Sequence, residues 1–351
     1  MANIKKLKEN TVKLVKLEDV CYNGSSSLSQ KDIIMLEGKY PVYGASGLIK
    51  YINFYKYDKE YIAIVKDGAG IGRTMILPAN SSVISTLQYI FPKENINIRY
   101  LYYALNAMDL SKYYSGVTIP HIYFKDYKKE ELYLPIIDEQ INIVNKLDKI
   151  REIIDIRKKQ IEELDEIIKS QFIEMFERGQ YPKDEFINIA KEIYAGGDKP
   201  KDISKVQDDE YLYPVFANGY ENEGLQGYSK SYRTGDNAVT ISARGTIGYS
   251  FIRNEKFTPI VRLITIIPHE KANIVYLKYA IDNLNIAGSG TSQAQLTVPD
   301  IKKKKITIPP IELQNKFADI VKQIDKQKFE IQNSLEEMQK LQESLMNKYF
   351  G

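Results

Sequence analysis

The sequence LPIIDEQINIVNKLDKI, from Leu134 to Ile150, recurs in similar form as IPPIELQNKFADIVKQI, from Ile308 to Ile324. The second copy lies 174 residues after the first, about half of the 351-residue chain. Solenoid repeats recur roughly every 20 to 50 residues, which is far shorter than this spacing. The pattern therefore indicates that one whole module has been duplicated.

Each copy opens a long amphipathic helix. In the first copy, mostly apolar residues recur in alternating steps of three and four, the pattern of a coiled-coil seam. Asp138 and Glu139 suit the first turn of this helix, and Gly179 and Pro182 suit its end. We expect a helix over 138–176, about 58 Å long at about 1.5 Å per residue. The same steps 174 residues later predict a second helix that runs to the end of the sequence.

Two such apolar seams in one chain most simply bury each other. Each helix could instead pack only on its own globular half, but an isolated domain rarely needs so long a helix. Lys328 stands in the second seam where the first has Ile154. The residues expected at the helix-pair interface are Leu147, Ile150, Ile154, Ile161, Leu164, Ile168, Val321, Ile324, Ile331, Leu335, Met338 and Leu345.

Composition limits the possible chemistry. A net charge of +3 and a hydrophobic fraction of 43% are ordinary, so partner choice has to be argued from local patches. The single cysteine, Cys21, excludes an intramolecular disulfide, and the two histidines, His121 and His269, lie far apart, so we expect no metal site. No segment approaches the roughly 18 apolar residues of a membrane helix. The N-terminus is basic, but no apolar stretch long enough for a signal peptide follows it. These features predict a cytoplasmic protein.

The sequence before each helix has a different residue pattern. YIAIVKDGAGIGRTMILP (61–78) and NAVTISARGTIGYSFIRN (237–254) are apolar, β-branched and interrupted by glycine, which predicts β-hairpins. The correspondence continues in YPVY (40–43) against YPVF (213–216), while the residues between these anchors diverge. A shared scaffold with unlike loops suits two domains that each read something different.

The repeat also includes a loop and a junction before each helix. SGVTIPHIYFKDYKKEELYLP (115–135) matches SGTSQAQLTVPDIKKKKITIP (289–309) without a gap. Each stretch contains a Ser-Gly-x-x-x-x-x-(Ile/Leu) loop and leads into a Pro-x-x-x-x-Gln junction, Pro135 to Gln140 and Pro309 to Gln314. The junction alone is a weak signal, but twice at this spacing, each time before a heptad helix, it is specific.

On these residues, almost the whole chain resembles the specificity subunit of a type I restriction-modification system. The resemblance implies an α+β fold with two β-rich target-recognition domains in tandem, each followed by a long helix, the two helices pairing as an antiparallel coiled coil. The corresponding boundaries are recognition domain 1 at 1–136, helix 1 at 137–179, recognition domain 2 at 180–309 and helix 2 at 310–351.

The resemblance also implies partners and a division of labour. Each recognition domain would read one half of a split double-stranded DNA target, and the helix pair would set the spacer and dock two modification subunits. Those subunits would methylate adenine with S-adenosylmethionine. A translocating restriction subunit, where the system has one, would use ATP and Mg²⁺, so this chain itself needs no cofactor.

Motifs of catalysis are missing from the chain. GAGIG (68–72) lacks the G-x-G-x-x-G spacing and is followed by a strand-like stretch, so it predicts a hairpin turn. No phosphate-binding P-loop occurs, and IPPIE (308–312) has the prolines of an adenine methyltransferase motif but neither flank. VPDIKKKK (298–305) resembles the start of a nuclease motif without its acidic partners. We therefore expect a non-catalytic subunit.

Candidate DNA contacts lie in the loops. Arg and Lys suit guanine, Asn and Gln suit adenine, and Tyr and Lys suit phosphates. His121 could equally be a packed structural residue. The candidates in the first half are Lys66, Arg73, Lys112, Tyr113, Tyr114, Thr118 and His121.

The second half offers Arg244, Ser292, Gln293 and Gln295. In an extended loop Gln293 and Gln295 point the same way, and Gln295 matches His121 in the repeat. A polar surface loop is the alternative for these residues. Lys302 to Lys305 are expected on a strand, where they alternate faces and form either a solvated edge or a partial phosphate contact.

Two other functions remain open at this point. A coiled-coil scaffold without nucleic-acid specificity would show little salt dependence in its binding, whereas a phosphate-tracking protein loses affinity steeply as salt rises. A self-sufficient restriction or modification enzyme is disfavoured by the missing motifs.

Overall fold

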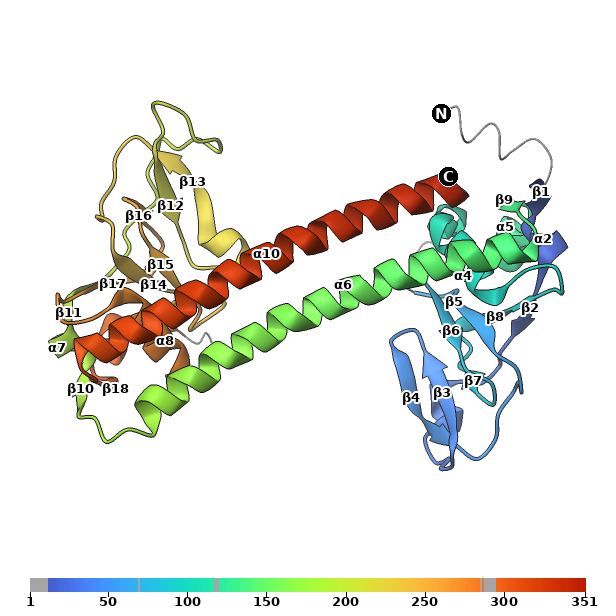
Figure 1. Ribbon diagram of the computed structural model, residues 1–351, viewed down its shortest axis with the longest axis horizontal. Helices are drawn as coiled ribbons and strands as arrows, with labels where there is room; N and C mark the ends of the chain where they lie inside the picture. The colour runs from blue at the N-terminus through green and yellow to red at the C-terminus, as the bar shows by residue number, and fades with distance from the viewer. Residues whose placement is uncertain (1–11, 69, 117–119, 285, 287–294) are drawn as a thin grey trace. The chain divides into compact units, whose positions relative to one another are not determined.

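The computed structural model describes residues 12–68, 70–116, 120–284, 286 and 295–351 (Figure 1). The chain divides into two compact units. Unit 1 comprises Met1–Arg157 with Ser334–Gly351, and unit 2 comprises Lys158–Asn333. Helix α6 (Ile137–Phe172) and helix α10 (Ile311–Phe350) each contribute to both units.

The described residues of unit 1 form three sheets. A four-stranded antiparallel sheet has the order β2-β8-β5-β6, a three-stranded sheet has the order β4-β3-β7, and β1 pairs with β9. Helix α4 (Ile98–Ala107) packs on the four-stranded sheet. The remaining elements are β1 (Lys13–Lys16), α2 (Leu17–Val20), β2 (Cys21–Ser25), α3 (Gln30–Ile33), β3 (Tyr40–Gly44), β4 (Gly47–Ile52), β5 (Tyr61–Val65), β6 (Thr74–Leu77), β7 (Ser82–Val83), β8 (Leu87–Pro92), η1 (Leu110–Tyr113), α5 (Phe124–Tyr127) and β9 (Glu131–Leu134).

Unit 2 repeats this set of sheets. Its orders are β11-β17-β14-β15, β13-β12-β16 and β10-β18, and helix α8 (Ile274–Asn283) takes the place of α4. The remaining elements are η2 (Ile173–Glu177), β10 (Lys183–Glu185), α7 (Phe186–Ile189), β11 (Ala190–Ala195), β12 (Tyr213–Phe216), η3 (Glu221–Gly224), β13 (Leu225–Ser229), β14 (Ala238–Ile241), β15 (Ser250–Arg253), β16 (Thr258–Pro259), β17 (Ile264–Pro268), α9 (Val298–Lys302) and β18 (Lys305–Thr307).

The predicted hairpins are confirmed. β5 pairs antiparallel with β6 from Tyr61↔Leu77 to Ile64↔Thr74, and β14 pairs with β15 from Ala238↔Arg253 to Ile241↔Ser250. β6 and β15 are the edge strands of their sheets in the described chain. The described residues of GAGIG, 68 and 70–72, therefore lie between the two strands of a hairpin, as expected.

The expected strand over the lysine run is wrong. Val298–Lys302 forms the short helix α9, Lys303 is its C-cap, and only Lys305 enters strand β18. The Thr297 hydroxyl accepts from the backbone N–H of Asp300, and the Asp300 carboxylate accepts from the backbone N–H of Thr297 at 3.0 Å. This reciprocal capping box, with Pro299 in the first turn, favours a helix start over a strand.

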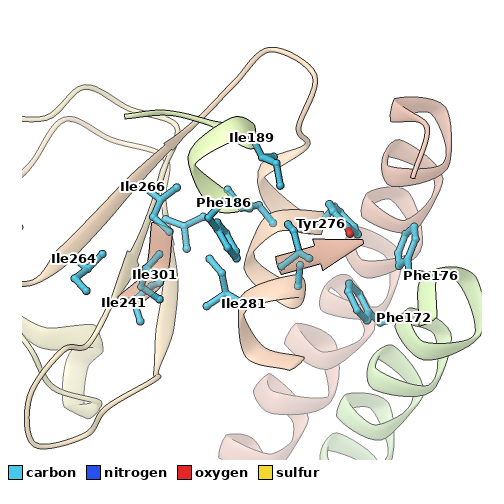
Figure 2. Packing of buried hydrophobic residues seen from close by; sticks show 14 of the residues in the cluster. Phe172, Phe176, Phe186, Ile189, Ile241, Ile264, Ile266, Tyr276, Ile281 and Ile301 are labelled. Atoms are coloured by element: carbon cyan, nitrogen blue, oxygen red, sulfur yellow. The ribbon is translucent and has the colours of Figure 1, made fainter. Parts of the chain in front are cut away.

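The long helices pack on each other in both units. In unit 1, Leu147 near the beginning of α6 shares an apolar cluster with Leu345 near the end of α10. In unit 2, Ile168 and Phe172 near the end of α6 share a cluster with Phe317 near the beginning of α10. Figure 2 shows Phe172 and Phe176 beside Tyr276 of α8 in that second cluster. The beginning of α6 thus packs with the end of α10 in unit 1, and the end of α6 packs with the beginning of α10 in unit 2. This is the arrangement of an antiparallel pair.

The glutamine that ends each Pro-x-x-x-x-Gln motif makes the same hydrogen bonds in both units. Gln140 is fully buried, its Oε1 accepts from the backbone N–H of Asn97 at 2.8 Å, and its Nε2 donates to the carbonyl of Pro135 at 2.8 Å. Gln314 makes the same bonds to Asn273 at 2.8 Å and to Pro309 at 2.9 Å. Asn97 and Asn273 are the N-caps of α4 and α8. Each glutamine therefore ties the start of a long helix to the start of the helix that covers the sheet.

Candidate nucleic-acid interface

In unit 1 the turn between β5 and β6 is joined to the loop before α5. The N–H of Gly68 donates to the carbonyl of Pro120 at 3.0 Å, and the N–H of Ile122 donates to the carbonyl of Lys66 at 2.9 Å. A β-bridge pairs Asp67 with His121 between these bonds. We call residues 66–68 and 70–72 with 120–122 the unit 1 junction. Two of the candidate DNA-contacting residues, Lys66 and His121, are thus brought together by backbone hydrogen bonds.

The side chains of the unit 1 junction form a small charged cluster. The Nδ1 of His121 lies 2.6 Å from Oδ1 of Asp67, and the Nζ of Lys66 lies 3.3 Å from Oδ2 of the same carboxylate. The side chain of His121 is 36% exposed and that of Asp67 is 21% exposed. The cluster is held in place and still open to a ligand.

Unit 2 contains the equivalent junction. The N–H of Leu296 donates to the carbonyl of Ala243 at 2.9 Å, and a β-bridge pairs Arg244 with Gln295. A guanidinium N–H of Arg244 donates to Oε1 of Gln295 at 2.9 Å. We call residues 242–248 with 295–296 the unit 2 junction. Arg244 is exposed.

The two turns share their backbone. Gly72 and Gly248 each precede the second strand of their hairpin with φ of +85° and +94°, a conformation that L side chains rarely adopt. In unit 2 the side-chain oxygen of Asn218 also accepts from the N–H of Ala243 at 2.7 Å. The frame is therefore common to both units, and the exposed side chains differ.

The other candidates of the first half have protein partners. The guanidinium of Arg73 donates to the carbonyl of Ala45 in the β3–β4 turn. Lys112 lies 2.6 Å from the carboxylate of Glu130, which also accepts from the hydroxyl of Tyr113. The hydrogen bond to Glu130 raises the pKa of Lys112. These contacts leave the cation of Lys112 available at the surface, although partly neutralised.

The remaining candidates are placed more briefly. Tyr114 is 63% exposed at the end of η1. Thr118, Ser292 and Gln293 lie outside the described residues. Asp67 was missed by sequence reasoning, yet aligning the turn KDG with ARG places it opposite Arg244 and would have found it.

The predicted seam residues lie on the inward side of the long helices. Leu147, Ile150, Ile154 and Leu335 are buried in unit 1, where Met338 and Leu345 are half-buried. Ile168, Val321 and Ile324 are buried in unit 2, where Ile161, Leu164 and Ile331 are half-buried. The Nζ of Lys328 lies 2.5 Å from the carboxylate of Asp165 on the facing helix. A cross-helix ion pair therefore occupies the seam where the first copy has an isoleucine.

Two further observations concern the described part of the chain alone. Within it, no group of three or more histidine, cysteine or acidic residues is placed to hold a metal ion. None of its helices combines the length and the apolarity that crossing a membrane requires.

Comparisons with known proteins agree with this architecture. The profile of the family described as type I restriction modification DNA specificity domain matches the chain twice, over residues 9–166 and 188–341. A Mycoplasma pneumoniae protein named as a type I specificity subunit is 28% identical over 329 residues, covering 88% of this chain and 87% of that protein. A Haemophilus influenzae protein named as a type I restriction enzyme specificity subunit is 27% identical, covering 83% and 81%.

Solved structures show the same fold. The crystal structure of the type I restriction-modification S subunit from M. genitalium matches with a TM-score of 0.65 at 16% identity, covering 98% of both chains. A chain solved in work on complex assembly of the type I R-M system matches with a TM-score of 0.58 at 15% identity, covering 97% of this chain and 98% of that one. With the family profile matching most of the sequence, the chain belongs to the type I restriction-modification DNA specificity family and is a DNA sequence-recognition subunit.

Proposed function

We propose that each half of this chain reads one half of a bipartite DNA target. The supporting observation is the repeated junction, in which the same backbone frame carries Asp67 and His121 in one unit and Arg244 and Gln295 in the other. Two equal readers would need equal side chains. Unlike side chains on a common frame suit a target whose two halves differ in sequence.

We also propose the rest of the division of labour, and membership of the family supports it. Recognition domains at 1–136 and 180–309 contact DNA, while the helices at 137–179 and 310–351 set the spacer between half-sites and dock two modification subunits. The seam residues reported above form the interface of the helix pair. The chain is non-catalytic and works in the cytoplasm, and S-adenosylmethionine, ATP and Mg²⁺ act on the modification and restriction subunits.

The test is the DNA motif itself. Full-length chain, with and without a modification subunit, is incubated with a library of randomised duplexes, and bound sequences are read. We expect a split motif with an unread spacer. Binding should weaken as salt rises: the logarithm of the association constant should fall with the logarithm of the salt concentration, with a slope of about −0.9 per phosphate contacted.

Three outcomes would contradict the proposal. A continuous motif would mean that the two halves do not read separately. Binding that ignores salt would indicate a scaffold without phosphate contacts. Methylation of DNA by the purified chain alone would show that the subunit is catalytic.

A further inference from the structure

We infer that the pairs Asp67–His121 and Arg244–Gln295 read bases at matched positions and present opposite hydrogen-bonding chemistry there. The first pair presents acceptors and selects a base with an exocyclic amino group, adenine or cytosine. The second pair presents donors and selects guanine. This inference rests on the proposed function, because it assumes that each junction faces the major groove.

The two pairs occupy one topological position. Asp67 and Arg244 are each the third residue after the last pair of the hairpin ladder on the first strand, Ile64 in β5 and Ile241 in β14. Each forms a β-bridge with a residue of the following loop, His121 or Gln295, and these partners lie 174 residues apart, the spacing of the whole repeat. The pairs are therefore equivalent by backbone contact as well as by sequence.

The unit 1 pair is rich in acceptors. A carboxylate only accepts, so the close contact between Asp67 and His121 requires Nδ1 of the imidazole to carry the proton. In the neutral ring this leaves Nε2 as an acceptor. Oδ2 of Asp67 offers a second acceptor, partly shared with Lys66 at 3.3 Å. In the major groove only adenine N6 and cytosine N4 present donors to such a pair.

The unit 2 pair is rich in donors. A guanidinium only donates, so Oε1 of Gln295 is the acceptor in its contact with Arg244, and one of the two lone pairs of this oxygen is taken by that bond. The remaining N–H groups of Arg244 and the amide N–H groups of Gln295 are left for a ligand. Guanine presents two acceptors side by side, O6 and N7, and is the base that such a pair fits.

Each junction is closed by backbone hydrogen bonds in addition to the side-chain contact of its pair. Backbone hydrogen bonds close the unit 1 junction at Gly68 and Ile122, and another closes the unit 2 junction at Leu296. Exchanging the side-chain pairs therefore leaves the bonds that hold turn and loop together. This separates a role in reading bases from a role in shaping the loop.

The experiment exchanges the two pairs. The full-length variants D67R/H121Q and R244D/Q295H are compared with the wild-type chain on the same library of randomised duplexes. In the first variant, one position of the unit 1 half-site should change from adenine or cytosine to guanine. In R244D/Q295H, the preference for guanine at one position of the unit 2 half-site should be lost. Each change should amount to about 10- to 100-fold in relative binding.

Controls separate this inference from the proposed function. The untouched half-site of each variant is an internal control, and the reversal K159E/E163K, an exposed ion pair on α6 at 3.4 Å, should leave both half-sites unchanged. Unaltered base preference in both exchange variants would overturn the inference. Loss of an entire half-site, both on exchange and in the mild variants His121→Gln and Arg244→Lys, would also overturn it, because the pair would then only support the loop. A wild-type chain that selects no split motif would instead refute the proposed function.

Discussion

Arg253 marks the clearest difference between the two units at the scale of single residues. It ends edge strand β15 with only 3% of its side chain exposed, where the equivalent residue of β6 is Leu77. Its guanidinium lies 3.6 Å from the centre of the Phe216 ring and donates to the Thr240 hydroxyl at 3.1 Å. Burial lowers the pKa of Arg253 to about 10, and the charge of Glu223 opposes this shift. Unit 2 thus buries a cation where unit 1 buries a methyl-rich side chain.

Glu223 compensates this buried cation. Its carboxylate accepts from Arg253 at 2.9 Å and its carbonyl accepts at 2.7 Å, although its backbone has a φ of +52°. We predict that Glu223→Gln lowers the free energy of unfolding of unit 2 by about 1 to 3 kcal/mol, because a buried charge loses its counter-charge while one carbonyl bond remains. Urea denaturation measures the change. The neighbouring exposed Glu221→Gln is the matched control, and equal stability of the two variants would show that the carboxylate contributes nothing.

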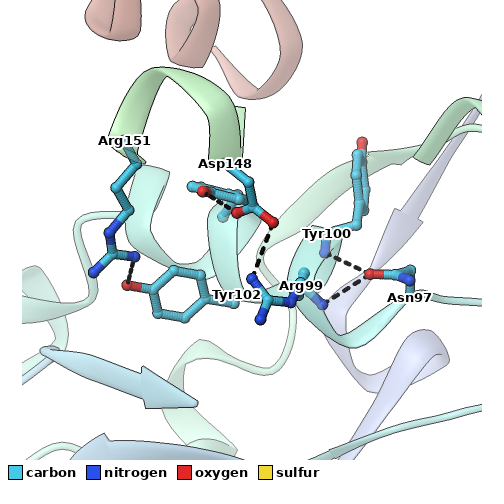
Figure 3. Close-up of polar contacts among 7 residues, drawn as sticks. Asn97, Arg99, Tyr100, Tyr102, Asp148 and Arg151 are labelled. Carbon is cyan, nitrogen blue, oxygen red and sulfur yellow. Dashed lines mark hydrogen bonds and ion pairs between the residues drawn. The ribbon is translucent and has the colours of Figure 1, made fainter. Parts of the chain in front are cut away.

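At the scale of elements, the buried glutamines explain why the Pro-x-x-x-x-Gln motif occurs before both long helices. Asn97 caps α4 by accepting from the N–H groups of Arg99 and Tyr100 at 2.9 and 3.2 Å (Figure 3). Its own N–H is satisfied by Gln140, which takes the part that an acidic residue three positions later plays in a capping box. Figure 3 also shows Asp148 of α6 bonded to Arg99. The beginning of α6 is therefore fastened to α4 by polar contacts as well as by its apolar seam.

Replacing either glutamine should loosen its own unit alone. Gln140→Leu keeps the side-chain volume but leaves the N–H of Asn97 and the carbonyl of Pro135 unpaired, so we predict a loss of about 2 to 4 kcal/mol in unit 1. Gln314→Leu should do the same in unit 2. Hydrogen exchange read by mass spectrometry assigns each loss to its unit. Gln323→Leu, exposed on α10, is the control, and protection unchanged at residues 95–100 in Gln140→Leu would contradict the prediction.

The sequence predicted elements best where periodicity is long or repeated. The seam of α6 and α10 and the hairpins with glycine turns could be read directly, because the seam runs through many turns and each hairpin occurs twice. The run from Lys302 could not, because the local capping box at Thr297 outweighs the strand-like pattern that follows. Asp67 was overlooked because its contact with His121 depends on a bridge between segments 54 residues apart. Such a pairing leaves no local pattern, so the signal for Asp67 is the alignment of the two repeats, which sets it opposite Arg244.

At the scale of the whole molecule, duplication explains how one chain carries two different readers. Both units contain a four-stranded, a three-stranded and a two-stranded sheet in the same relative order of strands. Contacts that hold this frame, such as Gln140 and Gln314, are kept in both copies. Half-buried Asp67 and exposed Arg244, at matching positions of the two units, differ in charge. The contacts that hold the frame therefore lie at other positions than the side chains that differ between the units, which allows one set to change without the other.

The length of the helix pair should determine the length of the unread spacer. Inserting seven residues after Arg157 in α6 and seven after Ile331 in α10 preserves both seams, since a heptad returns each apolar residue to the same face. Seven residues add about 10 Å of helix, so we predict a spacer longer by about three base pairs at about 3.4 Å each, with both half-sites unchanged. Selection from randomised duplexes reads the spacer. A heptad placed in α6 alone breaks the match between the two seams and should abolish split-site binding. An unaltered spacer in the doubly extended chain would mean that the helices hold the units together without measuring the distance between half-sites.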